Sequence, residues 1–444
     1  MSKQRRISPT WLTLLILCLL PLQTTTQDGW NKFWAQIIGQ QTVAEVLEAF
    51  KGERLTTDLD SNLRDVFVNE RRVSMQRAAR AQVFKQNRAK GKTQPLIPPT
   101  EPFPCDLSHA RSASPPTSVH ELRPGDIDVI ACMGDSLSAG NGLMSGRVQH
   151  SFNEFRALSF CGGGYGDWRS YLTLPNILRV FNPNITGYST KNELVVDKSS
   201  RLNIAEPLIM SIDMPYQARV IIDRMRQDPN IDMENHWKLL TIFVGNNDVC
   251  IEMCHYDNAT EFVLRHERDL RHTLTVLRDN VPRLMVNVLP MPNMVVTLYP
   301  MKNVPFGCFA VHSFGCHCIF SHAVGEKELK EASDRITKWH EVDQYVIKLP
   351  EFQTNDFAVV YHPFTADMVT PRLDNGETDY RFFAHDCFHF SQLGHAGMAN
   401  SLWNSLLQPE GKKILNMVKP FRHFECPTEE RPYFATLYNS YKKE

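Results

Sequence analysis

The sequence predicts a doubly wound α/β fold, in which helices cover both faces of a parallel sheet. Four short apolar runs have the length and composition of strands buried on both faces, and each is followed within two residues by glycine or proline. Amphipathic stretches with apolar residues every three or four positions lie between and after them, at 329–346 and 393–406. Strands that alternate with helices are typical of a parallel sheet. The expected strands are residues 126–132, 239–244, 284–289 and 357–361.

The composition indicates a folded protein without a general affinity for nucleic acid. Of 444 residues, 42% are hydrophobic and 22% are charged, which is enough apolar material for a core and excludes wholesale disorder. Lys and Arg number 48 and Asp and Glu 49, so the formal net charge is −1. A balance this even gives no general attraction to nucleic acid.

The first 26 residues have the pattern of a cleaved secretory signal. Lys3, Arg5 and Arg6 precede an apolar run from Trp11 to Leu22, and a polar segment follows. A membrane anchor is the alternative, but a span needs about 20 apolar residues and this run is shorter and contains a proline. We therefore expect a secreted, extracellular protein without a transmembrane anchor.

Residues 27–98 are expected to form a helical basic pro-region or spacer. The stretches 43–50 and 63–84 have helical spacing with many charges, and no acidic residue occurs between Arg71 and Thr100. Such a segment can bind an anionic lipid surface, but a solvated helical region is the interpretation we favour. Several prolines between 95 and 104 cannot continue a helix, so the main domain is expected to occupy residues 99–444.

The cysteines indicate disulfide bonds. Eleven are present, and ten remain beyond the expected signal, an even number that favours bridging in a secreted protein. A free buried thiol at Cys132, inside the first expected strand, stays open as an alternative. So does a zinc site, whose ligands would be Cys308, Cys316, His317 and Cys318.

Two sequons predict N-glycosylation. They are centred on Asn184 and Asn258, each followed two positions later by threonine. A modified asparagine must lie at the surface, so both positions are expected to be exposed.

Three polar motifs follow expected strands, where the sites of open α/β sheets lie. Ser136 stands in a glycine-rich loop after the first strand, Asn247 follows the second, and Asp386 precedes His389 by three residues after the last. A serine becomes a nucleophile when a base lies within hydrogen-bond reach and a third group orients that base. An asparagine amide can donate to a developing oxyanion. Together the motifs predict nucleophilic catalysis, which we prefer to a metal cluster of His385, Cys387, His389 and His395.

With these motifs the sequence resembles the GDSL or SGNH hydrolases, and within them the phospholipase B group. The resemblance covers roughly residues 100–412 and includes the loop Gly134-Asp-Ser-Leu-Ser-Ala-Gly-Asn-Gly142, the segment 237–248 and the segment 386–391. It implies a flavodoxin-like sheet with helices on both faces and a serine esterase that needs no metal or cofactor. It also implies phospholipid or lysophospholipid substrates, met at a membrane surface or in micelles.

The resemblance assigns roles position by position. Ser136 is the nucleophile, His389 the general base and then acid, and Asp386 the carboxylate that orients it. The backbone N–H of Ser136 and the side-chain amide of Asn247 are expected oxyanion donors. A third donor in the family is a glycine N–H, and here Leu208 holds that position; its side chain opposes a positive φ.

We therefore expect a secreted serine esterase or lipase of the phospholipase B type, acting on acyl esters through an acyl-enzyme. Leu208 motivates one alternative, a catalytically weak or inactive lipid-binding protein on the same fold. A carbohydrate O-acetyl esterase is the other. No calcium requirement is expected, because no carboxylate-rich ion loop occurs in the sequence.

Overall fold

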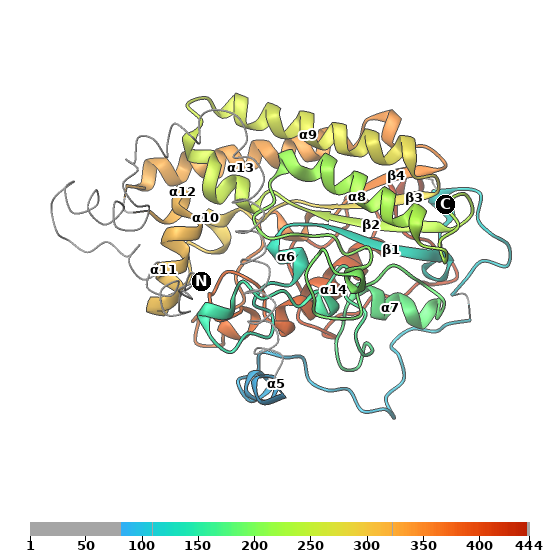
Figure 1. Cartoon of the computed structure of the whole chain (residues 1–444), viewed down its shortest axis with the longest axis horizontal. Helices are drawn as coiled ribbons and strands as arrows, with labels where there is room; N and C mark the ends of the chain where they lie inside the picture. The colour runs from blue at the N-terminus through green and yellow to red at the C-terminus, as the bar shows by residue number, and fades with distance from the viewer. Residues whose placement is uncertain (1–80, 109, 322, 442–444) are drawn as a thin grey trace, which may run out of the picture. The chain divides into compact units, whose positions relative to one another are not determined.

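The computed structural model describes residues 81–441, except 109 and 322 (Figure 1). The expected signal, the helical stretch 43–50 and most of the expected pro-region lie outside these residues. Only the end of the stretch 63–84 is described, as the beginning of helix α5 (Ala81–Ala89).

A parallel sheet forms the centre of the described chain. Its strands β1 (Ile127–Gly134), β2 (Trp237–Phe243), β3 (Leu284–Leu289) and β4 (Phe357–Tyr361) pair in the order β1-β2-β3-β4. On the other edge of β1, Thr186 and Asn203 form isolated parallel bridges, so extended backbone lies where a further strand would pair. This places β1 inside the sheet, as in the flavodoxin-like order. The predicted parallel sheet and α/β class are confirmed.

Helices cover both faces of this sheet (Figure 1). Successive side chains of a strand point to opposite faces, so Ile130 and Cys132 of β1 pack in one core and Val129, Ala131 and Met133 in another. The first core takes residues of α7 (Leu174–Phe181) and α14 (Gln392–Leu407). The second takes residues of α8 (Met214–Gln227), α9 (Ala259–Asn280) and α13 (Glu326–Ile347).

The two expected helices correspond to α13 and α14, and α14 is buried almost all round. No helix of the described residues is both long and apolar enough to span a lipid bilayer. The remaining α-helices of the described residues are α6 (Ser136–Ala139), α10 (Met294–Thr297), α11 (Phe306–Gly315), α12 (His317–Phe320) and α15 (Leu437–Ser440).

The expected bridging of the ten cysteines is confirmed. Cys132 is bonded to Cys161, so the alternative of a free thiol in the first strand is wrong. Three bridges converge on the segment that holds α11 and α12, and a fourth ties the start of the domain to its C-terminal region. The pairs are Cys105–Cys426, Cys132–Cys161, Cys250–Cys316, Cys254–Cys318 and Cys308–Cys387.

The turn after β1 requires glycine at position 134. Gly134 has a φ of +151°, and a Cβ built there would lie 2.4 Å from the Phe243 carbonyl oxygen. An added methyl group cannot be accommodated unless β1 and β2 move apart. The approach of these two strands therefore fixes the position of the residues that follow Gly134.

We predict that Gly134→Ala destabilises the protein by about 1–3 kcal/mol or more, because it overpacks a backbone contact. Urea unfolding followed by tryptophan fluorescence measures the change. Gly315→Ala is the matched control, because nothing lies within 4 Å of a Cβ at that position. Equal midpoints for the two variants would contradict this explanation of the turn.

Candidate active site

Ser136 stands at the carboxyl end of β1, where it is the first residue of α6. Asp135 begins the helix by accepting a hydrogen bond from the Leu137 backbone N–H at 2.9 Å. Gln217 of α8 holds the preceding Gly134 by hydrogen bonds to both its N–H and its carbonyl. The serine hydroxyl is thus presented from a turn whose backbone is fixed on two sides.

Asp386 and His389 share one short turn. The Asp386 carboxylate is fully buried and accepts the backbone N–H groups of Phe388 and His389 at 3.1 and 3.0 Å. Its other oxygen lies 2.6 Å from His389 Nδ1. Burial alone would raise the pKa of Asp386, but the charge of His389 and these hydrogen bonds hold it well below its usual range. The carboxylate is therefore ionised at neutral pH and fixes the imidazole.

The structure brings the serine and histidine motifs together. His389 Nε2 lies 2.8 Å from Ser136 Oγ, although 253 residues separate them in the sequence. The three side chains form one hydrogen-bonded chain from carboxylate to imidazole to hydroxyl. This arrangement can deprotonate the serine as it attacks an electrophile.

Asn247, which follows the carboxyl end of β2, lies beside the segment that contains Leu208. Asn247 Nδ2 donates to the carbonyl of Ile209 at 2.8 Å, and the amide carries a second N–H. Leu208 adopts a φ of +66°, the left-handed conformation that favours glycine. Its side chain is 64% exposed, so it points away from the packed interior.

Asn246 and Asp248 connect the motifs, although no sequence pattern assigned them a role. Asn246 donates through Nδ2 to Asp135 at 2.7 Å, which joins the turn after β2 to the serine turn. Burial raises the pKa of Asp135 to about 6, although the hydrogen bonds from Asn246 and Leu137 lower it. Asp248 accepts the N–H and hydroxyl of Ser211, and so positions the segment that contains Leu208. Their only signal in the sequence is their place inside the motifs.

A segment before the expected domain start at residue 99 supports both loops of the candidate site. Asn87 donates to the carbonyls of Met144 and Ser145, in the loop that follows Ser136. Lys92 donates to the carbonyls of Tyr380 and Phe383, just before Asp386. Burial lowers the pKa of Lys92 to about 8, although the charge of Asp386 raises it. The described residues from 81 to 98 therefore belong to the same compact unit as the site.

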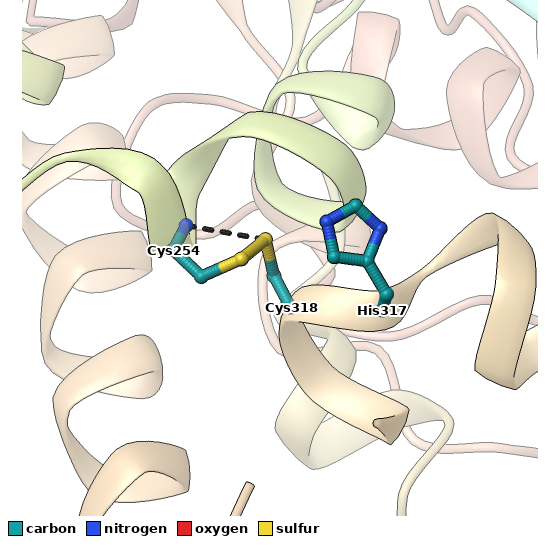
Figure 2. A group of neighbouring side chains, drawn as sticks. All are labelled: Cys254, His317 and Cys318. Carbon is teal, nitrogen blue, oxygen red and sulfur yellow. Dashed lines mark hydrogen bonds between the residues drawn. A yellow bond between two sulfur atoms is a disulfide. The ribbon is translucent and has the colours of Figure 1, made fainter. Parts of the chain in front are cut away.

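The two metal sites considered from the sequence are not formed. Every cysteine in them belongs to a disulfide, so it offers no thiolate to zinc. Figure 2 shows His317 beside the Cys254–Cys318 bridge. His317 Nε2 instead lies 3.1 Å from His255 Nε2. In the second cluster, which contains His385 and Cys387, His395 Nδ1 accepts a hydrogen bond from the backbone N–H of Phe160. His389 is already hydrogen-bonded to Asp386.

The GDSL-like Lipase/Acylhydrolase family model matches residues 130–402, a range that contains Ser136, Asn247, Asp386 and His389. The chain belongs to this family. Membrane-associated phospholipase B1 of Homo sapiens is 36% identical over 355 residues, which are 78% of this chain and 24% of the relative. The Mus musculus protein of the same name is 34% identical over 342 residues, 74% of this chain and 22% of the relative.

The chain thus spans about a quarter of the length of the curated relatives it matches. Among solved structures, phospholipase A1 from Streptomyces albidoflavus NA297 is 14% identical and covers 61% of this chain and 95% of its own, with a TM-score of 0.29. The family model and the phospholipase relatives confirm the predicted GDSL, phospholipase B-like family and support the predicted class of ester hydrolase.

We predict that His395 makes the fold sensitive to acid. Burial, and then the charge of His389, lowers its pKa to about 3. Between about pH 6.5 and pH 3 the unfolded chain binds a proton that the folded chain does not, so stability falls as the pH falls, by up to about 1.4 kcal/mol per pH unit.

His395→Asn should therefore show a shallower decline of unfolding free energy over this range, whatever its stability at pH 7. Urea unfolding at several pH values measures the slope. The same change at the exposed His272 serves as the control. Parallel slopes for the wild type and His395→Asn would show that this imidazole is protonated within the folded protein.

Proposed function

We propose that this protein is a secreted serine esterase of the phospholipase B type, which hydrolyses acyl esters of phospholipids and lysophospholipids. The observation that carries the proposal is the hydrogen-bonded chain from Asp386 through His389 to Ser136. The family match supports the ester chemistry, and the relatives named phospholipase B1 support the substrate class.

The geometry supports a two-step mechanism. His389 Nε2 takes the proton of Ser136 Oγ as the oxygen attacks the ester carbonyl, and the Asp386 carboxylate stabilises the imidazolium that forms. His389 then gives the proton to the leaving alcohol, and an acyl-serine remains. In the second step His389 Nε2 takes a proton from a water molecule as the water oxygen attacks the acyl carbonyl carbon. The bond from this carbon to Ser136 Oγ then breaks, His389 returns the proton to Oγ, and the fatty acid is released.

Three donors are proposed for the oxyanion. Ser136 begins α6, so its backbone N–H has no acceptor inside that helix. Asn247 has a second amide N–H besides the one bound to Ile209. Leu208 supplies a backbone N–H in the conformation that glycine would adopt, with its side chain turned toward solvent. This conformation supports an active enzyme over the alternative of an inactive lipid-binding protein.

Secretion, glycosylation and the physical state of the substrate are proposed on separate grounds. Five disulfides and the N-terminal pattern support secretion into an oxidising environment. Asn184 and Asn258 are both exposed, which supports their glycosylation. We propose that the substrate is met in a membrane surface or a micelle, because long acyl chains hold phospholipids in such aggregates.

Ser136→Ala should abolish hydrolysis of phosphatidylcholine, lysophosphatidylcholine and short nitrophenyl esters, because no other group forms the acyl-enzyme. The purified variant and the wild type are compared on all three substrates, with circular dichroism as the control for folding. Equal hydrolysis by the two proteins would refute the proposed function. Hydrolysis of acetylated sugars in preference to all three would favour the carbohydrate esterase.

Asn247→Ala should lower kcat by on the order of a hundredfold with a small change in KM, because its amide binds charge that exists only in the transition state. Leu208→Gly should raise kcat on short esters, because glycine keeps the same backbone N–H in the same conformation and removes the side chain beside it. Steady-state kinetics on a nitrophenyl ester measures both. An unchanged kcat in Asn247→Ala would remove this residue from the mechanism, and a slower Leu208→Gly would show that the leucine side chain assists the site.

A further inference from the structure

Helix α11 carries an exposed aromatic face. Phe306 and Phe314, two turns apart, are 79% and 73% exposed, and Phe309 between them is also exposed. Exposed apolar residues are ordinary when scattered singly, but three phenylalanines on one ten-residue helix form a patch. We call Phe306, Phe309 and Phe314 the α11 face.

The sequence around this face carries no formal charge. From Asn303 to Gly325 it contains no Lys, Arg, Asp or Glu, whereas α13, which follows directly, begins with alternating charges. A surface helix that faces only water normally has a charged outer side. The outer side of α11 has aromatic residues in its place, so its composition suits an apolar or interfacial environment.

Covalent bonds hold this helix in place. Cys308 on the opposite side of α11 is buried and bonded to Cys387, and His312, one turn later, lies 3.2 Å from the Cys387 carbonyl oxygen. The bridges Cys250–Cys316 and Cys254–Cys318 fix the residues that follow. The helix is therefore anchored on its inner side, and the phenylalanines remain outside.

Cys387, to which α11 is bonded, lies in the turn that carries Asp386 and His389. The same turn positions the imidazole. Figure 1 shows α10, α11 and α12 at the end of the sheet where α6 begins. A surface that receives the α11 face would thus lie at the same end of the sheet as Ser136.

We propose that the α11 face docks onto the surface of a phospholipid bilayer or micelle and brings the active site to its substrate. This proposal rests on the proposed function, because a lipid aggregate is the neighbour that a phospholipid esterase must approach. An uncharged aromatic face fits the boundary between head groups and acyl chains, where aromatic rings are favoured. A charged protein partner would find no complementary charge between residues 303 and 325.

Binding is tested without turnover, in the Ser136→Ala background, by flotation with phosphatidylcholine vesicles. Phe306→Ser, Phe314→Ser and the double substitution are compared with Tyr345→Ser. Tyr345 is also exposed, but it lies near the end of α13, which leads to the amino end of β4. The site lies at the carboxyl ends of the strands, so Tyr345 is at the other end of the sheet. We expect the double variant to lose on the order of tenfold or more in vesicle partitioning, and Tyr345→Ser to bind like the parent.

Hydrolysis separates this proposal from the proposed function. With Ser136 restored, the double variant should hydrolyse a monomeric short nitrophenyl ester at the wild-type rate and vesicle phospholipid on the order of tenfold more slowly. If the wild type fails on both substrates, the proposed function is wrong, while the flotation result still tests the docking.

Equal vesicle binding by the double variant and its parent would overturn the docking proposal. In that case, either of two further observations would show what covers the α11 face instead of lipid. Unchanged binding with a shift from dimer to monomer in analytical ultracentrifugation would assign it to a second copy. Unchanged binding with new proteolytic cleavage in residues 27–80 would assign it to the chain's own N-terminal region.

Discussion

The fully buried carboxylate of Asp386 is the constraint on which the site depends. A charge without solvent is tolerated only where hydrogen bonds and an opposite charge replace the water, and here two backbone N–H groups and the His389 imidazole do so. The same three contacts fix the turn from Asp386 to His389. They leave Nε2 of the ring directed at Ser136, so the stability of the turn and the orientation of the imidazole have one physical cause.

Contacts elsewhere in the molecule hold the Ser136 turn and the His389 turn in fixed positions relative to each other. On the serine side, the close approach of Gly134 to β2 and the hydrogen bond from Asn246 to Asp135 fix the turn after β1. On the histidine side, the disulfide from Cys387 to α11 and the hydrogen bonds from Lys92 hold the loop. The segment 87–94 contacts both loops, so a part of the chain outside the family match contributes to the geometry of the site.

The sequence predicted those features that depend on local pattern. The strands, the helices α13 and α14 and the motifs around Ser136 and His389 all follow from apolar spacing or from short signatures. The role of Lys92 did not, because a lysine that donates to carbonyls 288 and 291 residues away leaves no local trace. Disulfide pairing likewise depends on distances that only the folded chain defines. Leu208 was predictable only in part. Its alignment with a family glycine indicated a positive φ, but only the structure shows that a leucine can adopt this φ with its side chain exposed.

The Asp386–His389 pair is proposed above to make Ser136 a nucleophile. Labelling with a fluorophosphonate, followed by peptide mass spectrometry, tests it most directly, because the reagent bonds covalently to an activated serine and needs no knowledge of the natural substrate. We predict one rapidly labelled residue, Ser136, and on the order of a thousandfold slower labelling in His389→Gln. Rapid labelling at another serine, or equal rates for Ser136 in the wild type and His389→Gln, would contradict it.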